Sequence, residues 1–316
     1  MLIGVDLGGT NIKVGIVNQE GHILFQNSRA TIPSRPYQSI VQDIIEQIEE
    51  GMMQINRSVS EIHSIGIGIP GIAEQQTGKV IYCTNLSWYD VPIGKMLRDH
   101  FNKPVFVEND ATVAALAESV SGSTKGLANS VFLTLGTGVG GGIIINHKAY
   151  SGSHGAGSEI GHTIVGENFY ACNCGRNGCL ETFASATAMI RYAQKRLREG
   201  AQGRELLDMV EGNIENITAK AIFDCAQKGD RLAIEVVDRT IKYLAIGIAN
   251  IHNMLDPDCI TIGGGVSKAG DALLIPLREA VKKLTFCKSV DYGDITLAQL
   301  GNEAGIIGAA FLGVHQ

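Results

Sequence analysis

Two glycine-rich segments of similar sequence, about 130 residues apart, constrain the fold of this chain more than any other feature. The first runs from Asp6 to Lys13 (DLGGTNIK) and the second from Leu135 to Gly142 (LGTGVGGG). Each is flanked by apolar and β-branched residues, which is typical of a tight hairpin whose bare backbone N–H groups close on phosphate oxygens. One such hairpin is more often a plain turn, but two copies in the order leucine, glycine, threonine indicate an internal duplication. We therefore expect a nucleotide to be held between two halves of the molecule.

Length and composition favour an ordinary globular protein of two domains with a cleft between them. At 316 residues the chain exceeds the size at which a single core usually stops growing. The net charge of −6 argues against nucleic acid or anionic lipid as a partner. No apolar run approaches the roughly 18 residues that span a bilayer, and the first strand follows Met1 without a basic segment or a cleavage site. We expect a cytoplasmic location and no membrane partner.

Alternating strand and helix patterns predict an α/β fold. The expected strands cover residues 2–6, 12–17, 22–30, 65–71, 104–107, 130–135, 141–146, 259–262 and 295–297. The expected helices cover residues 37–55, 111–121, 182–199, 218–228, 231–254 and 271–284, with a closing helix from about residue 303. Small polar residues at 121–126 predict a domain boundary. The expected parts are an N-terminal domain at 1–121, a C-terminal domain at 122–300, and a closing helix at 301–316 that packs back on the N-terminal domain.

Four residues in the C-terminal half have the spacing of a zinc site. They are His162, Cys172, Cys174 and Cys179, in the pattern His-x9-Cys-x-Cys-x4-Cys. Side chains of these types complete a tetrahedral shell for zinc, and the glycines between the cysteines permit tight turns. The alternative is a set of scattered structural thiols. A full protein shell predicts a structural Zn²⁺ in a reducing compartment, with no position left for an activated water.

Asn109 and Asp110 stand between a predicted strand and a predicted helix, where catalytic groups collect in open α/β sheets. Helix capping is the alternative, since both residue types are favoured at that position. The two roles are compatible, because a helix N-terminus favours an ionised carboxylate. Phosphoryl transfer needs a positioned acceptor for the proton of the substrate hydroxyl. Asp110 is therefore the candidate base.

Polar residues beside the predicted zinc ligands suit a polyhydroxylated ligand. Glu159 and His162 lie three apart, so one helical turn would aim both side chains the same way. Glu181 follows the last zinc cysteine by two positions. If zinc holds one imidazole nitrogen of His162, the other is free to point outward. Fixed carboxylates and an imidazole match sugar hydroxyls, which both donate and accept hydrogen bonds; the alternative for the two glutamates is a solvated surface.

Residues around the glycine loops complete the predicted nucleotide site. Asp6 would orient Mg²⁺ through water, or serve only as a turn residue. Lys13 would reach a phosphate or cover a sheet edge. The glycines at 263–265 follow a buried strand and would admit a purine or ribose, or form a helix-entry turn. We assign Trp88, the sole tryptophan, to packing.

These residues together resemble the ROK family of sugar kinases, within the superfamily of sugar kinases, heat-shock 70 and actin, over essentially the whole chain. The two glycine loops are similar to the family's phosphate motifs, and residues 263–266 to its adenosine motif. The segment from Cys172 to Glu181 (CNCGRNGCLE) is the strongest signature. Together with Asn85-Leu86-x-Trp88 and Pro92, it is most similar to the bacterial ATP-dependent glucokinases. Ser87 and Ser158 stand where this resemblance favours glycine.

The resemblance implies a duplicated two-domain fold of the actin-like and ribonuclease H-like type, with an interdomain cleft. It implies ATP-dependent phosphorylation of a hexose, most of all glucose, at its 6-hydroxyl, with Asp110 as general base. The implied cofactors are ATP, Mg²⁺ and structural Zn²⁺, and the implied assembly is a homodimer or homotetramer. The implied sugar-binding residues are Gly71, Asn85, Asn109, Asp110, Glu159, His162 and Glu181. The implied nucleotide-binding residues are Asp6, Gly8, Gly9, Thr10, Lys13, Gly136, Thr137, Gly138, Gly263, Gly264 and Gly265.

Two alternatives stay open at this point. An N-acylhexosamine kinase would differ only in the room around the second carbon of the sugar. A sugar-sensing transcriptional regulator of the same family would carry a helix-turn-helix ahead of the first strand, and we expect none here because that strand begins at Met1.

Overall fold

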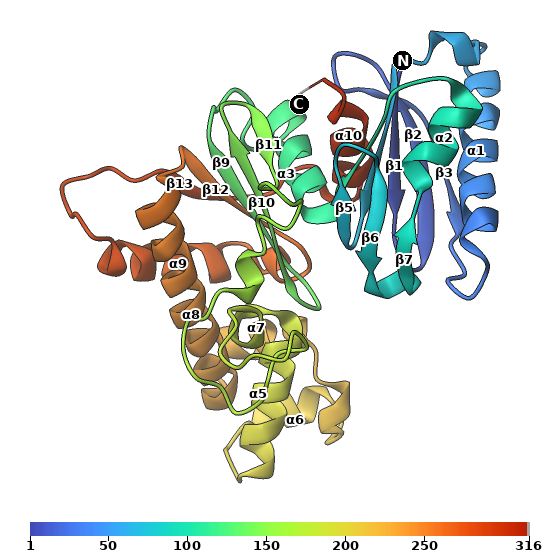
Figure 1. The fold of residues 1–316 in the computed structure, drawn as a ribbon. Helices are drawn as coiled ribbons and strands as arrows, with labels where there is room; N and C mark the ends of the chain where they lie inside the picture. Colours follow the sequence, from blue (N-terminus) through green and yellow to red (C-terminus); the bar gives the residue numbers. More distant parts are fainter. Residues whose placement is uncertain (315–316) are drawn as a thin grey trace. The chain divides into compact units, whose positions relative to one another are not determined.

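The computed structural model describes residues 1–314 and contains two five-stranded sheets and a smaller third sheet (Figure 1). The first sheet has the order β3-β2-β1-β4-β8 and the second the order β11-β10-β9-β12-β13. Each sheet begins with three strands that are consecutive in the chain and lie in reverse sequence order, β3-β2-β1 or β11-β10-β9. Two strands from later in the chain then complete the sheet. This repeated topology confirms the predicted duplicated α/β fold.

The bounds of the strands are as follows. The first sheet contains β1 (Leu2–Leu7), β2 (Asn11–Val17), β3 (Ile23–Ala30), β4 (Ser64–Ile69) and β8 (Val105–Asn109). The second contains β9 (Ser130–Leu135), β10 (Val139–Ile145), β11 (Lys148–Tyr150), β12 (Cys259–Gly263) and β13 (Asp294–Leu297). The third, an antiparallel sheet, contains β5 (Ile72–Glu74), β6 (Lys79–Cys83) and β7 (Trp88–Val91).

The helices fall between and after these strands. They are α1 (Tyr37–Gln54), α2 (Ile93–Phe101), α3 (Asp110–Ser121), α4 (Glu181–Ala184), α5 (Ala186–Arg198), α6 (Arg204–Met209), α7 (Ala219–Gln227), α8 (Arg231–Leu255), α9 (Asp271–Leu284) and α10 (Ala304–Phe311). Short 3₁₀ turns that concern the site are η2 (Thr84–Leu86), η3 (Ile160–His162) and η5 (Val266–Ala269). None of the helices within residues 1–314 combines the length and the apolar character that crossing a bilayer requires.

The chain divides into two compact units. Unit 1 comprises Met1–Phe132, Gly142–Ser158 and the residues from Gln299 onward, and unit 2 comprises Leu133–Gly141 and Glu159–Ala298. Two of the four unit boundaries thus fall within β9 and β10, and the other two follow Ser158 and Ala298. The domain division predicted at residues 121 and 122 stays a prediction.

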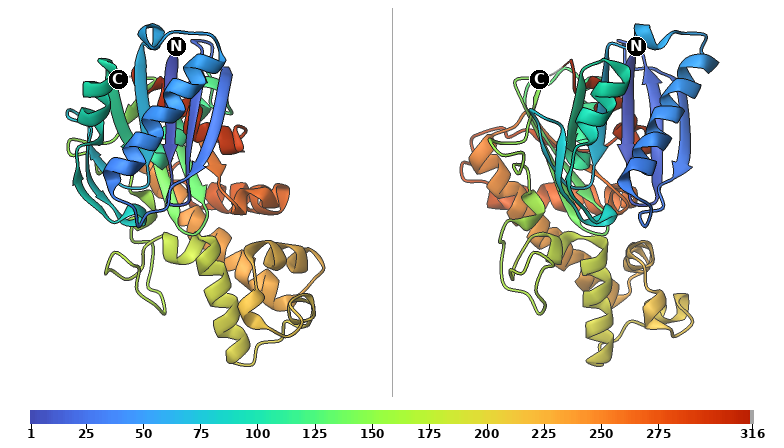
Figure 2. Two further views of the ribbon diagram at one scale, coloured as in Figure 1. Left: turned by 90° about the vertical axis from the view of Figure 1, so that its right-hand side faces the viewer. Right: turned by 45° about the vertical axis from the view of Figure 1, so that its right-hand side comes forward.

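Helices cover both faces of the first sheet in unit 1 (Figure 2). On one face α1 buries an apolar stripe, and its Gly51 packs on Phe25 and Ile16. On the other face α10 packs directly on the backbone, since a Cβ on Gly4 would lie 1.9 Å from the carbonyl oxygen of Ile306. The last helix of the chain is therefore built into the core formed by its first strands.

In unit 2 the long helix α8 is the centre of the helical packing. It runs for 25 residues and contacts α4, α5, α7 and α9. Its start is fixed by Asp230, which caps the helix by accepting a hydrogen bond from the Ala233 backbone N–H at 2.8 Å. An apolar stripe along α8, including Leu244 and Ile248, is fully buried, so this helix organises the unit that carries the predicted zinc ligands.

The predicted helix at 182–199 is wrong as a single element. The structure breaks it at Ser185, whose side chain accepts a hydrogen bond from the Ala188 backbone N–H at 3.0 Å and so begins a new helix, α5. The third sheet and the helices α2 and α6 were not predicted. Trp88 is 4% exposed and packs edge-on against Tyr37, which confirms its assignment to the core.

The contact between α10 and the first sheet predicts a large effect of a single methyl group. A Cβ on Gly66, in β4, would lie 1.7 Å from the carbonyl oxygen of Ala309, so Gly66→Ala forces the helix away from the sheet. We expect the free energy of unfolding to fall by roughly 2–3 kcal/mol, as for other overpacked cores. Denaturant titration followed by circular dichroism measures it. Gly265→Ala is the control, because Gly265 has helical φ and ψ and open space at its Cβ; equal midpoints for the two variants would contradict this packing.

Candidate active site and metal centre

The first glycine loop joins β1 to β2 and is closed by hydrogen bonds. The Gly8 backbone N–H donates to the Asn11 carbonyl at 3.0 Å, and the Thr31 hydroxyl donates to the Gly8 carbonyl at 2.7 Å. Gly9 lies against Asn85, since a Cβ on Gly9 would be 3.1 Å from the Asn85 Cβ. The loop is held on both sides by protein groups, which fixes its shape.

Asp6 and Lys13 face each other across β1 and β2 and form an ion pair. The Lys13 Nζ lies 3.0 Å from the Asp6 Oδ2, and both side chains are partly exposed. Because β2 lies inside the sheet rather than at its edge, the alternative role of Lys13 as cover for a sheet edge is wrong. The pair places one negatively charged and one positively charged side chain beside the first glycine loop.

Asn109 serves as the helix cap, whereas the role of Asp110 as base stays a prediction. The Asn109 side-chain oxygen accepts hydrogen bonds from the backbone N–H groups of Ala111 (2.9 Å) and Thr112 (3.3 Å), so Asn109 is the helix cap. Asp110 is the first residue of α3 and is exposed, and its Oδ1 accepts from the Ala111 N–H at 2.8 Å. The start of a helix favours the ionised form of such a carboxylate. Asp110 is thus an oriented and accessible acceptor for a proton.

Direct contacts connect the residues of unit 1 that were predicted to bind sugar. The Asn109 side-chain amide donates to the Gly71 carbonyl at 3.2 Å. Gly71 packs on the end of β6, where its Cβ would lie 2.2 Å from the Tyr82 carbonyl oxygen. The turn η2, which carries Asn85, follows β6 directly and reaches Gly9. Unit 1 therefore brings Gly71, Asn85, Asn109, Asp110 and the first glycine loop together.

Glu108 supports this arrangement and was missed by the sequence analysis. Its carboxylate is 5% exposed and accepts hydrogen bonds from the side chains of Gln75 (2.8 Å) and Ser151 (2.7 Å) and from the Asn109 backbone N–H (2.8 Å). Three partners satisfy the buried carboxylate and fix the end of β8 just before Asp110. The signal in the sequence was an ionisable residue inside an otherwise apolar strand.

In unit 2 the second glycine loop lies beside the predicted adenosine motif. The loop joins β9 to β10 and is closed by the Gly136 N–H, which donates to the Gly138 carbonyl at 3.0 Å. Gly264 has a φ of +84° and packs on the backbone of Leu135, where a Cβ would lie 2.5 Å from the carbonyl oxygen. Only glycine fits at that position. Gly136 and Gly265 have open space at their Cβ positions, which leaves room for a ligand.

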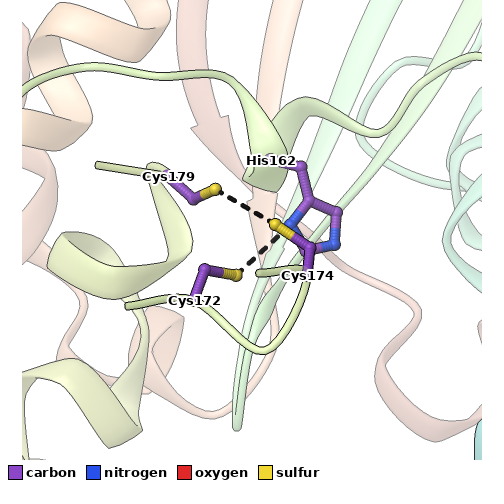
Figure 3. Close-up of side chains that lie close together, drawn as sticks. All are labelled: His162, Cys172, Cys174 and Cys179. Carbon is purple, nitrogen blue, oxygen red and sulfur yellow. Dashed lines mark hydrogen bonds between the residues drawn. The ribbon is translucent and has the colours of Figure 1, made fainter. Parts of the chain in front are cut away.

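The four predicted zinc ligands converge in unit 2 (Figure 3). The nitrogen and sulfur atoms that His162, Cys172, Cys174 and Cys179 offer all lie within 4.8 Å of one another. The Cys174 and Cys179 sulfurs are 3.6 Å apart, and the Cys172 sulfur is 3.6 Å from the His162 Nδ1. The structure thus groups the ligands that the spacing predicted, and none of the seven cysteines, all within the described residues, forms a disulfide.

These distances fit a tetrahedral zinc ion. With Zn–S bonds of about 2.3 Å and Zn–N bonds of about 2.0 Å, neighbouring ligand atoms lie about 3.8 Å apart for two sulfurs and about 3.5 Å apart for sulfur and nitrogen. Both 3.6 Å separations agree with those edges. The donor set of three thiols and one imidazole also matches the softness of zinc.

The thiols of the cluster differ in acidity for reasons visible in their surroundings. Burial raises the pKa of Cys172 to about 12 and also raises that of Cys179. Hydrogen bonds from the backbone and side chain of Arg176 lower the pKa of the exposed Cys174 to about 6. Since zinc binds thiolates, metal binding would release protons from the two buried thiols.

The acids predicted to accompany His162 lie on different sides of the cluster. The Glu159 Oε2 is 3.9 Å from the His162 Nε2, the ring nitrogen that does not face the cysteines. The Glu181 Oε1 is 3.7 Å from the Cys172 sulfur, while its Oε2 accepts a hydrogen bond from the Val139 N–H in the second glycine loop at 3.1 Å. His162 is therefore shared between the thiols and a carboxylate, as a metal-ligating imidazole usually is. The grouping of these unit 2 residues with Asp110 in one sugar site stays a prediction.

Known proteins resemble this chain over almost its whole length. The model of the ROK family matches residues 2–316. A protein of Halalkalibacterium halodurans named glucokinase is 39% identical over 311 residues, covering 98% of this chain and 94% of that protein. A glucokinase of Thermotoga maritima is 38% identical over 312 residues, covering 98% and 96%. The crystal structure of a ROK family glucokinase from Streptomyces griseus, in complex with glucose and AMPPNP, has a TM-score of 0.78 at 34% identity and covers 98% of both chains.

The geometry of the cluster predicts one zinc ion per chain that depends on Cys174. We expect Cys174→Ala to lose most of its zinc, because three remaining ligands hold the metal far more weakly in a site this exposed. Elemental analysis of purified protein by plasma mass spectrometry measures the ratio of metal to protein. Cys287→Ser, a change to a partly exposed thiol outside the cluster, is the control and should keep one equivalent. A full equivalent of zinc in Cys174→Ala would disprove the assignment.

Proposed function

Because the chain belongs to the ROK family, we propose that it transfers the terminal phosphoryl group of ATP to the 6-hydroxyl of a hexose, with glucose as the preferred sugar. Similarity over nearly the full length to proteins named glucokinase supports both the reaction and the sugar. The observation that carries the proposal is the accessible Asp110 carboxylate at the start of α3, connected through Asn109 and Gly71 to the turn that touches the first glycine loop.

Asp110 is the general base of this reaction. It accepts the proton of the 6-hydroxyl while the hydroxyl oxygen attacks the terminal phosphorus atom. The bond from that phosphorus to the bridging oxygen breaks, and ADP leaves. In a loose phosphoryl-transfer transition state the protein mainly positions the groups and stabilises charge. The carboxylate lies at the N-terminus of α3, where the helix dipole favours negative charge, and the Asn109 cap fixes the start of that helix. Gly71, Asn85 and Asn109 bind the sugar from the same unit.

The glycine loops bind the nucleotide. Backbone N–H groups of Gly8, Gly9 and Thr10 and of the loop Gly136–Gly138 bind phosphate oxygens, and Gly263–Gly265 accommodate the adenosine. Lys13 adds a positive charge beside the first loop. Asp6 would hold Mg²⁺ through water, and the ion would supply positive charge against the phosphates. The Asp6 carboxylate, whose Oδ2 pairs with Lys13, has the hard oxygen donors that this ion prefers.

The metal centre has a structural role in this proposal. Its four protein ligands would hold Zn²⁺ and leave no position for water. Glu159, His162 and Glu181 contribute to sugar binding, and the cluster orients them. All seven cysteines are free, which supports a reducing compartment and hence the cytoplasm. We expect a homodimer or homotetramer, as the family resemblance implies.

The base assignment predicts a loss of turnover without a loss of fold. We expect Asp110→Asn to lower kcat roughly 10²- to 10⁴-fold, because an amide cannot accept the hydroxyl proton. The amide oxygen can still accept the Ala111 N–H, so the thermal midpoint should hardly move. Asp99→Asn, at an exposed acid on α2 that pairs with Lys95, is the control and should keep full turnover. Near-normal activity of Asp110→Asn would remove the base from the mechanism.

The choice of sugar predicts a ranking that one assay can test. A coupled measurement of ADP release should give the highest kcat/KM with glucose in a panel that also contains mannose, fructose, allose, N-acetylglucosamine and N-acetylmannosamine. A higher kcat/KM with an N-acetylated sugar would mean that the substrate is an N-acylhexosamine and not glucose. No ADP release with any sugar, from folded and zinc-replete protein, would refute the kinase, and a gel-shift assay would then test the regulator.

A further inference from the structure

The second glycine loop, residues 135–142, is braced by one segment that contains a metal ligand and by another that directly follows the last one. One segment is the turn η3, which presents His162, and the other is α4, which begins two residues after Cys179. Both reach the same residue of the loop, Val139, from unit 2 itself. The loop that we assign to phosphate binding therefore has the metal cluster as its support.

On the side of η3 the support is a backbone-to-backbone contact. A Cβ on Gly161 would lie 1.9 Å from the Val139 carbonyl oxygen. Gly161 directly precedes His162, so a ligand bond at His162 fixes the turn that lies against the loop. A displacement of this turn cannot be absorbed by a side chain, because none lies between the two backbones.

On the side of α4 the support is the Glu181 carboxylate. Its Oε2 accepts the Val139 N–H at 3.1 Å, and Gly138 leaves the space that this contact needs, since a Cβ there would be 2.1 Å from the same oxygen. Its Oε1 lies 3.7 Å from the Cys172 sulfur. Because Glu181 stands two residues after Cys179, the carboxylate joins the segment that follows a metal ligand to the loop. The Ala186 N–H adds a second link from the following helix to the Gly136 carbonyl at 2.8 Å.

A carboxylate in this position is unfavourable for phosphate binding by charge alone, because it adds a negative charge beside the phosphates. Any contribution of this carboxylate to phosphate binding must then come from the geometry that it imposes on the loop. By holding the Val139 N–H, it fixes the direction of the neighbouring backbone amides of Thr137 and Gly138. Preorganised amides bind an anion without the cost of ordering the loop.

We propose that Glu181 is a positioning residue that couples the metal centre to the second glycine loop, so that the cluster sets the affinity for nucleotide as well as for sugar. This inference rests on the proposed function, because it takes the loop as a phosphate site. It extends that function, since the family resemblance gives Glu181 only a contact with sugar.

Calorimetric titration of a non-hydrolysable ATP analogue with Mg²⁺, in the absence of sugar, tests the coupling. We expect Glu181→Ala to raise the Kd of the analogue roughly 10-fold, because the Val139 N–H loses its acceptor. Glu181→Gln keeps an acceptor oxygen and should stay within about 3-fold of the unchanged protein. Glu199→Ala is the control, since Glu199 is an exposed acid at the end of α5 that pairs with Lys195, and its nucleotide Kd should not change. Zinc-stripped protein should bind the analogue as weakly as Glu181→Ala does.

A second variant guards against an indirect effect through the metal. Gly138→Ala displaces the Glu181 carboxylate without touching a metal ligand. As a single change in the wild-type protein it should raise the Kd of the analogue, but it should add little to the effect of Glu181→Ala when the two are combined. Elemental analysis confirms the zinc content of each variant. An unchanged Kd in zinc-replete Glu181→Ala, or full additivity of the two changes, overturns the coupling and leaves the kinase proposal standing. If the unchanged protein does not bind the analogue, both fail.

Discussion

The direct contact between α10 and the backbone of the first sheet determines where the chemical groups of unit 1 lie. Gly4 and Gly66 allow the helix to touch β1 and β4 without side chains between them. Because α10 lies this close, its Gly305 meets the Asp6 carboxylate and its Gly308 meets the Val113 carbonyl of α3. The helix thereby fixes α3, whose first residue is Asp110. A closely packed core transmits any displacement to these residues, so the candidate base depends on a helix near the end of the chain.

Carboxylates that accept backbone N–H groups hold the irregular segments of both units. Glu108 fixes the end of β8 before Asp110, and Glu181 fixes the second glycine loop. Glu118, 1% exposed near the end of α3, accepts from the Ser123 N–H (2.7 Å) and from the N–H groups of Gln299 (2.9 Å) and Leu300 (3.0 Å). Hydrogen bonds to a charged acceptor are stronger than neutral ones. These hydrogen bonds therefore help the loops to keep defined shapes.

The sequence predicted the fold best where a regular pattern repeats over a whole element. The strands of the first sheet and the long helices α1 and α8 were found because apolar residues recur at the strand or helix period. The third sheet was missed because its strands bury few residues each, so no period appears. The helix break at Ser185 depends on one capping hydrogen bond, which a periodic pattern does not reveal. The metal cluster was predictable from spacing, whereas the bond between Glu181 and Val139 joins residues 42 apart and is seen only in three dimensions.

Two departures from the family pattern fall at positions with a left-handed backbone. Ser87 and Ser158 stand where the resemblance favours glycine, and both have positive φ, at 53° and 69°. A left-handed backbone costs a residue with a side chain about 1–2 kcal/mol, and Ser158 offsets part of that cost by donating from its hydroxyl to the Tyr150 carbonyl at 2.8 Å. The loops therefore keep a glycine-type conformation without glycine, next to the turn with Asn85 and next to Glu159. The two serines therefore add hydroxyl groups to the loops that carry Asn85 and Glu159, at positions whose backbone conformation favours glycine.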